Sequence, residues 1–302
     1  MREDGSMEMQ LKELRELASR AENRRTETGI PRIAMVKGAV PEHRLATVYE
    51  PMINLILSGQ KTMTVGDRSF RYDPATYFVM SVDLPALGSV EPSEDGEPYL
   101  AVSLTLEPFR LTQLLGDLPK AATEGRCSSG FSVAPVTPEL LDAWLRMLRL
   151  LDKPTDIAAL APVYEREILF RVLQGPLGWM LREIATPEST VSKIEIAIQW
   201  IKEHFALPLR VKPLADMAAL SASAFHRHFK AVTALSPLQY QKRVRLLHAR
   251  TMLIARERNI TATAFAVGYE SATQFSREYA RLFGSSPSKD AFEIAHEVRL
   301  HA

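Results

Sequence analysis

The spacing of apolar residues changes along the chain, from alternation in the first third to helical spacing afterwards. Between residues 30 and 106, short apolar runs are separated by turn residues such as Gly66-Asp67. The clearest predicted strands are Ile53–Leu57, Thr62–Val65, Ser69–Tyr72 and Tyr77–Met80. Closely spaced short strands are typical of a small antiparallel barrel or sandwich, and Gly-Asp between two of them predicts a tight hairpin.

Helical spacing begins at Thr137, which can cap a helix whose first position is Pro138. An apolar stripe follows at steps of three or four residues: Leu141, Trp144, Leu145, Leu148 and Leu151. With Arg146 and Arg149 on the opposite face, this stripe fits either a core or a dimer seam, and we favour the seam. Further helices are predicted over 163–173 and 177–184, before a polar linker at 185–190.

The last third predicts a helix over 191–205 and then two short helices joined by a tight turn. A helix over 212–218 leads into the turn Ala219-Leu220, and Ser221 can cap the next helix, which buries Phe225 and Phe229 at i and i+4. Two short helices with a tight turn and a capped second helix form the helix-turn-helix pattern.

The pattern recurs after residue 259. Here Gly268 supplies the turn, because glycine adopts positive φ readily, and Ser271 with Gln274 predicts a capping box. Phe275, Tyr279 and Phe283 form the buried face of the second helix. A helix over 237–254 joins the two copies, and its 18 residues span about 27 Å. Two recognition helices held in this way can enter successive major grooves, about 34 Å apart.

Composition and charge narrow the class of protein. No apolar run approaches the ~20 residues of a membrane span, the N-terminus lacks the apolar stretch of a secretory signal, and the one cysteine excludes an internal disulfide. We therefore expect a soluble, cytoplasmic protein.

The charge is unevenly distributed along the chain. Residues 194–290 hold 14 basic and 7 acidic residues, net +7, which leaves 23 basic and 29 acidic residues elsewhere, net −6. A basic third suits contact with phosphates, although solvated surface charge would give the same count.

The last third resembles the AraC/XylS family of transcription regulators. The resemblance rests on Ile260–Ser271, Gln274–Arg277 and Phe283–Pro287 and extends over about 191–290. Ala219 departs from the pattern, since helix-turn-helix turns often carry glycine. The resemblance implies binding of double-stranded DNA at two half-sites one turn apart. Carried over by position, the DNA-contacting residues are Ser223, His226, Arg227 and Lys230 in the first copy and Ala272, Thr273, Ser276, Arg277 and Arg281 in the second.

Their chemistry differs. Arginine can grip the N7 and O6 atoms of guanine with two hydrogen bonds, and Ser, Thr or His can bond to a base edge or a phosphate. Lys230, Arg243, Arg245 and Arg281 are candidates for phosphate contacts, which position the protein without reading sequence.

The segment Glu167–Gly178 resembles a subgroup of this family whose N-terminal domain is a cupin-like barrel. The resulting fold class is α+β: a cupin-like β-barrel with following helices, then an all-α DNA-binding domain of two helix-turn-helix motifs joined by a long helix. The expected domains are a helical extension at 1–28, a sensor and dimerisation domain at 29–186, and a DNA-binding domain at 191–297. The candidate ligand-lining residues are Tyr49, Met52, Phe78 and Met80, although plain core is the interpretation that we favour for each of them.

Other chemistry finds little support. Before residue 204 the only histidine is His43, whereas cupin metal sites use several, so we expect no metal and no cofactor. No nucleophile elbow, P-loop or dinucleotide-binding motif is present. Cys127 follows Arg126, which could activate the thiol as a sensor, but a single cysteine is more often a buried small apolar residue.

Three functions remain open from the sequence. The first is a regulator that responds to a small molecule in the barrel, with a homodimer or a monomer–dimer equilibrium and RNA polymerase as further partners. The second is a constitutive DNA-binding regulator whose barrel only dimerises. The third is a barrel enzyme fused to a DNA-binding module, which the shortage of histidines disfavours.

Overall fold

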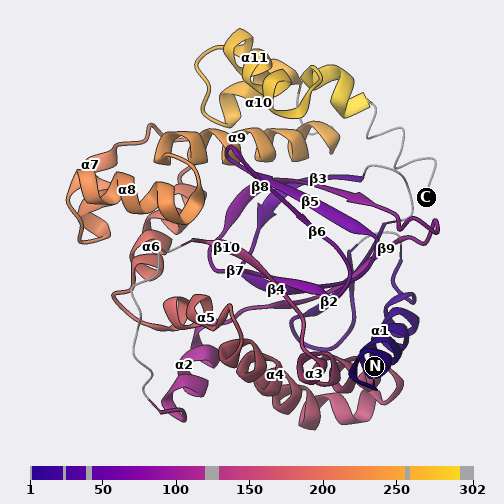
Figure 1. Ribbon diagram of the computed structural model, residues 1–302. Coiled ribbons are helices and arrows are strands. Elements are labelled where there is room, and N and C mark those ends of the chain that lie inside the picture. The colour runs from indigo at the N-terminus through magenta and orange to yellow at the C-terminus, as the bar shows by residue number, and fades with distance from the viewer. Residues whose placement is uncertain (1, 23–24, 39–42, 120–128, 256–258, 293–302) are drawn as a thin grey trace. The chain divides into compact units, whose positions relative to one another are not determined.

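The computed structural model describes residues 2–22, 25–38, 43–119, 129–255 and 259–292 (Figure 1). The chain divides into two compact units: residues 1–195 with 231–234, and residues 196–230 with 235–302. The first contains the sheets and is called the sheet unit, and the second is called the helical unit.

The sheet unit contains two antiparallel sheets rather than one closed barrel. The six-stranded sheet has the order β1-β2-β9-β4-β7-β10 and the four-stranded sheet the order β3-β8-β5-β6. The strands are β1 (Arg25–Glu27), β2 (Ile33–Gly38), β3 (His43–Tyr49), β4 (Met52–Ser58), β5 (Gln60–Val65), β6 (Arg68–Tyr72), β7 (Thr76–Met80), β8 (Leu84–Glu91), β9 (Tyr99–Thr105) and β10 (Phe131–Pro135). The expectation of a small antiparallel β-domain is confirmed, and its detail is corrected from a closed barrel to two separate sheets.

The hairpin between β5 and β6 forms as its sequence predicts. Val65 pairs with Arg68, so Gly66-Asp67 is a two-residue loop, and Gly66 has a φ of +65°. That left-handed conformation is the one required by the hairpin turns whose twist matches the strands. The turn therefore fixes the β5–β6 register, which places Lys61 opposite Tyr72.

Helices cover the six-stranded sheet (Figure 1). They are α1 (Arg2–Ala18), α2 (Pro108–Gly116), α3 (Pro138–Leu148), α4 (Ile157–Gln174) and α5 (Gly178–Ala185), with two short 3-10 turns between α3 and α4. The segment expected as a helical extension contains α1 and, in addition, strand β1. Helix α4 begins at Ile157, six residues before the predicted start, and includes Pro162.

The predicted dimer seam on α3 is instead part of the core. Leu141, Trp144, Leu145 and Leu148 are each at most 2% exposed within the single chain. They belong to one apolar cluster with side chains of α1, α4, α5 and alternate residues of β4 and β9. Our preference for a dimer seam was wrong, because the face that the stripe covers lies inside the sheet unit.

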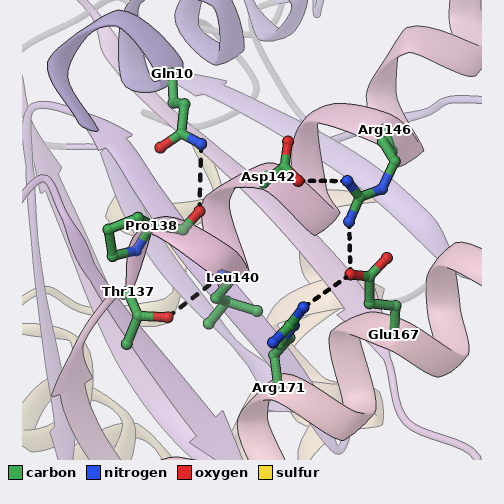
Figure 2. Close-up of polar contacts among 8 residues, drawn as sticks. All are labelled: Gln10, Thr137, Pro138, Leu140, Asp142, Arg146, Glu167 and Arg171. Carbon is green, nitrogen blue, oxygen red and sulfur yellow. Dashed lines mark hydrogen bonds and ion pairs between the residues drawn. The ribbon is translucent and has the colours of Figure 1, made fainter. Parts of the chain in front are cut away.

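Polar contacts tie α1, α3 and α4 together at the edge of this core (Figure 2). Thr137 caps α3 by accepting a hydrogen bond from the backbone N–H of Leu140, and Gln10 of α1 donates to the carbonyl of Pro138 at 3.3 Å. Arg146 binds Asp142 on its own helix and Glu167 of α4, the latter at 2.6 Å. Arg146, which the sequence placed on the face opposite the apolar stripe, therefore forms its ion pairs inside the sheet unit.

The remaining helices are α6 (Thr190–Glu203), α7 (Val211–Met217), α8 (Ala222–Thr233), α9 (Pro237–Ile254), α10 (Ile260–Ala266) and α11 (Ala272–Phe283). Helix α9 has the bounds predicted from the sequence. It connects the pair α7–α8 to the pair α10–α11 (Figure 1). Ser236 and Gln239 form a full capping box at its start.

Both predicted serine caps of the second helices are present. Ser221 accepts a hydrogen bond from the N–H of Ala224, and Ser271 accepts one from the N–H of Gln274. The capping box predicted at Ser271 is incomplete, since only the half in which Ser271 accepts from Gln274 forms, and the Gln274 amide nitrogen donates to Glu278 at 3.2 Å. Glycine at residue 284, with a φ of +79°, ends α11 in the left-handed conformation common at helix C-termini.

Candidate nucleic-acid interface and buried polar cluster

The first recognition helix, α8, separates apolar from polar residues. Phe225 and Phe229 are fully buried, while Ser223, His226, Arg227 and Lys230 are exposed. The preceding turn places Ala219 at a φ of +52°. A left-handed conformation is strained for alanine, so the departure from glycine seen in the sequence has a local structural cost.

The second recognition helix, α11, repeats this separation. Phe275 and Tyr279 are fully buried. Of the predicted DNA-contacting residues, Thr273, Arg277 and Arg281 are exposed, whereas Ala272 and Ser276 are half-buried. Each recognition helix therefore presents a polar face with arginine at its centre, opposite an aromatic face that holds the helix in place.

The turn between α10 and α11 depends on close packing. Gly268 has a φ of +89°, and a Cβ atom there would lie 2.2 Å from the carbonyl oxygen of Ala206. Arg245 of α9 reinforces this approach, since it donates to the carbonyls of Phe205, Leu207 and Gly268 at 2.6, 2.9 and 2.7 Å. The guanidinium of Arg245 thus binds backbone carbonyls inside the helical unit, which weakens the case for the predicted phosphate contact, and that contact stays a prediction.

Two polar networks fix α11 against its surroundings. Glu278 accepts hydrogen bonds from Lys242 at 2.7 Å and from the Tyr269 hydroxyl at 2.8 Å. Burial raises the pKa of Glu278, but the hydrogen bonds from Lys242, Tyr269 and Gln274 outweigh it and leave the pKa lowered. Asp290 accepts hydrogen bonds from Arg250 at 2.8 and 3.2 Å and from the Tyr279 hydroxyl at 2.7 Å.

In the sheet unit, the alternation of the strands separates two buried faces. Ile53 and Leu55 of β4, with Tyr77 and Val79 of β7, pack against the helices. The residues between them, including Asn54, Phe78 and Met80, point away from the helices into the interior between the sheets. The predicted ligand-lining residues Tyr49, Met52, Phe78 and Met80 are all buried, and none belongs to the helix-facing core.

The interior holds a cluster of polar residues that sequence reasoning missed. Lys61 of β5 is 5% exposed and lies on the same face as Met63 and Val65. Its Nζ atom lies 4.7 Å from the ring centroid of Tyr49 and 5.6 Å from that of Phe78. Burial lowers the pKa of this amine from its ordinary 10.5 to about 7. The available signal was the alternation Lys61-Thr62-Met63-Thr64-Val65, which puts the lysine on the apolar face.

Two tyrosines complete this cluster. Tyr72 pairs with Lys61 across β5 and β6, and its ring centroid lies 5.1 Å from that of Phe78. The hydroxyls of Tyr72 and Tyr99 and the side-chain oxygen of Asn54 are buried, and none of the three has a hydrogen-bond partner among the described residues. Burial raises the pKa of both tyrosines well above the ordinary value, with the neighbouring phenols adding to the effect.

The structure does not describe the side chains of two residues considered in the sequence analysis, the possible sensor Cys127 and the histidine His43. Cys127 lies outside the described residues, as does the side chain of His43, although its backbone belongs to β3. Within the described ranges there is no group of three or more His, Cys, Asp or Glu residues placed to hold a metal ion. A search of the same ranges finds no helix with the length and hydropathy of a membrane span.

Comparison with known proteins decides the family. The family described as "AraC-type transcriptional regulator N-terminus" matches residues 29–180, which is half of the chain, and a helix-turn-helix domain matches residues 214–291. The chain belongs to the AraC-type transcriptional regulators. The resemblance noted in the sequence is thereby confirmed at the level of the family.

Individual relatives of this AraC-type regulator match over part of their length. The HTH-type transcriptional activator RhaS of Escherichia fergusonii is 35% identical over 128 residues, covering 42% of this chain and 46% of RhaS. RhaS of Escherichia coli is 33% identical over 125 residues, covering 40% and 44%. The chain thus spans about half the length of these curated relatives.

Solved structures extend the likeness to the whole fold of the AraC-type regulator. ToxT of Vibrio cholerae bound to an unsaturated fatty acid has a TM-score of 0.55 and 11% identity, covering 86% of this chain and 94% of ToxT. A second structure of ToxT has a TM-score of 0.53 and 12% identity, covering 86% and 96%. At this identity the likeness shows the fold alone, a sheet-rich N-terminal part followed by a helical part.

Proposed function

We propose that this regulator reads DNA sequence through the exposed faces of α8 and α11 and responds to a small molecule held inside the sheet unit. One observation supports the reading of DNA by α8 and α11. Each of the two helices has an exposed polar face with an arginine at its centre, opposite a buried aromatic face. Arg227 and Arg277 are assigned to base contacts, with Ser223, His226, Ala272, Thr273 and Ser276 beside them, and Lys230 and Arg281 to phosphates.

The geometry of the helical unit supports two half-sites one turn apart. Helix α9, whose 18 residues span about 27 Å, joins the two motifs in one polypeptide. Adjacent major grooves on one side of a duplex are about 34 Å apart. One chain can therefore engage a site that many helix-turn-helix proteins read as dimers.

Selection of bound genomic fragments by the purified chain tests this assignment. The fragments should share two short motifs about one helical turn apart, and binding should survive a second, higher salt concentration. Sequence-blind binding that disappears with salt would leave only the phosphate contribution and would contradict the assignment.

Single substitutions test the roles of the two arginines. Arg227→Ala and Arg277→Ala should each weaken operator binding by about 1–3 kcal/mol and relax specificity at one base position. Arg68→Ala, which removes an exposed arginine of the sheet unit, is the matched control and should leave binding unchanged. An equal loss on every DNA sequence would assign the arginines to phosphates instead.

The response to a small molecule is supported by the buried interior between the sheets and by the fatty-acid-bound ToxT structure, which shares the fold. An effector acts only if it binds the two functional states with different affinity. A constitutive regulator is the alternative, and operator affinity that no bound small molecule changes would favour it.

We extend the proposal to the chain's assembly, surroundings and chemistry. A homodimer or a monomer–dimer equilibrium, contact with RNA polymerase and a cytoplasmic location all fit a transcription regulator, and no catalytic activity is proposed. The dimer no longer has the α3 stripe as support, since that stripe is core. Sedimentation of the chain with and without operator DNA tests the dimer, and metal analysis of the purified protein tests the alternative of a barrel enzyme.

A further inference from the structure

The most unusual group in the sheet unit is the Lys61 amine, which is buried and forms no ion pair with any described residue. In the part of the chain that the structure describes, its Nζ atom lies over the rings of Tyr49 and Phe78, and no carboxylate forms an ion pair with it. Lysine is almost never fully buried unless it is paired. Another buried charge in the same unit has a partner of opposite charge, because Arg32 forms an ion pair with the buried carboxylate of Glu165.

The surroundings of Lys61 add hydrogen-bond donors that also lack partners. Tyr72 lies directly opposite Lys61 on the neighbouring strand, and the phenols of Tyr72, Tyr99 and Tyr49 are close enough to influence one another electrostatically. The Tyr72 and Tyr99 hydroxyls form no hydrogen bond, although a buried polar group without one is costly. One amine and two hydroxyls therefore share this interior, and neither hydroxyl donates to the Asn54 side-chain oxygen, which is buried there and also lacks a partner among the described residues.

The rest of this interior is apolar. Met63 and Val65 continue the face of β5 that carries Lys61, and Met80 and Phe131 face each other in register on β7 and β10. Phe78 and Phe131 have ring centroids 5.1 Å apart. Small-molecule sites are typically apolar, with a few polar groups that fix orientation.

We propose that the interior between the two sheets binds a small molecule that carries one carboxylate on an apolar body, with the Lys61 amine as its counter-ion and the Tyr72 and Tyr99 hydroxyls as donors to it. The carboxylate supplies the negative charge that no ion pair gives Lys61 among the described residues, and it supplies acceptor lone pairs for the two hydroxyls. A dianion such as a phosphate monoester fits less well, because the cluster offers one cation. This inference rests on the proposed effector response and names the chemical class of the effector.

The proposal is tested with matched pairs of compounds on the full-length chain. The probes are straight-chain carboxylates of four to twelve carbons and cinnamate, each compared with the primary amide of the same skeleton. Calorimetric titration should find at least one acid that binds tenfold or more tightly than its amide. Equal affinity of acid and amide for every skeleton, or no binding by any acid, would overturn the proposal.

Two substitutions locate the binding energy. Lys61→Met keeps the length and apolar stem of the side chain, and it should abolish the preference for the acid. Lys37→Met, the same change on β2 where the amine donates to the carbonyl of Ser19, is the control and should keep that preference. A preference that persists in Lys61→Met would place the acid elsewhere.

Proton uptake gives a readout that does not depend on any variant. At pH 8 most of the Lys61 amine is neutral, because its pKa is about 7, so binding of a carboxylate should draw a proton from the buffer. Titrations in two buffers of different ionisation enthalpy should show uptake of close to one proton per acid bound, and no uptake with the amide. Binding of the acid without uptake would contradict the assignment of Lys61 as counter-ion.

Operator binding measured beside these titrations separates this inference from the proposed function. If amides and acids bind equally and both change operator affinity, the effector response stands and the carboxylate class fails. If an acid binds through Lys61 and operator affinity stays constant, the carboxylate site stands and the effector response fails.

Discussion

Arg250 in the helical unit and Lys61 in the sheet unit are both buried cations, but the chain treats them differently. Arg250 donates to both carboxylate oxygens of Asp290, and the Tyr279 hydroxyl binds the same carboxylate. Lys61 faces the rings of Tyr49 and Phe78 instead. A buried charge whose partner is built into the chain holds the fold together, whereas one whose partner is missing is a candidate functional group.

The largest effect should come from breaking the paired charge. Asp290→Ala leaves the Arg250 guanidinium, 11% exposed, without its carboxylate. Removal of one partner of a buried pair typically costs about 3–5 kcal/mol, and urea unfolding of the helical unit measures the loss. Operator binding should weaken with it, because Tyr279 of α11 loses the same partner. A loss well below ~1 kcal/mol would mean that this pair is not the anchor described here.

Removal of the unpaired charge should have the opposite sign. Lys61→Met replaces a buried amine, which has no hydrogen-bond acceptor among the residues that the structure describes, with an apolar side chain of similar length. Burial of such a polar group costs about 1–3 kcal/mol in proteins, so the variant should be more stable than the wild type by about that amount. Urea unfolding without any added carboxylate is the measurement, and a less stable variant would indicate a partner for Lys61 within the chain.

The pH dependence of stability sharpens the same comparison. Burial lowers the pKa of Lys61 to about 7, so between pH 7 and about 9.5 the unfolded chain binds more protons at this site than the folded chain. Stability should therefore rise with pH in this window, by about 1 kcal/mol per pH unit, relative to Lys61→Met. The facing phenols of Tyr49, Tyr72 and Tyr99 stay neutral there, because burial raises their pKa values. Parallel pH profiles for the two proteins would contradict the lowered pKa.

The smallest effect should come from a paired charge at the surface. Glu13 of α1 accepts hydrogen bonds from Arg149, just after α3, at 2.7 and 2.8 Å. Both side chains are more than a third exposed, and exposed pairs are worth about 0.2–1 kcal/mol. Glu13→Gln should therefore lower stability by less than ~1 kcal/mol in thermal unfolding. A loss of stability as large as that of Asp290→Ala would show that burial does not explain the difference in strength between the Glu13–Arg149 and Asp290–Arg250 pairs.

The helical unit could be predicted almost completely because its signals are local. Serine caps, apolar residues at i and i+4, and the bounds of α9 depend on neighbours within one or two turns, and each prediction of this kind matches the structure. In two places a side chain bonds to a group other than the one that its local sequence suggests. Gln274 binds Glu278 rather than closing the capping box, and Arg245 binds carbonyls at 205–207 and 268.

The buried polar cluster could not be assembled in the same way. Its members lie on β3, β5 and β6 of one sheet and on β9 of the other, so they come together only through the strand order of the first sheet and the packing of the two sheets. The predicted strand began at Thr62, whereas β5 begins at Gln60, so Lys61 fell outside it. The predicted ligand-lining residues lie on the interior side of the sheet unit, and their contact with a ligand stays a prediction.

The approach of Gly268 to Ala206 has a consequence for building hybrid regulators. The segment 205–207 supplies the wall against which the second turn rests and the carbonyls that Arg245 holds. A DNA-binding module grafted from this chain onto a foreign sensor would thus need α6 and the residues after it, with the junction ahead of Thr190. A splice at Pro208 would remove the backbone at residues 205–207, against which the turn at Gly268 packs.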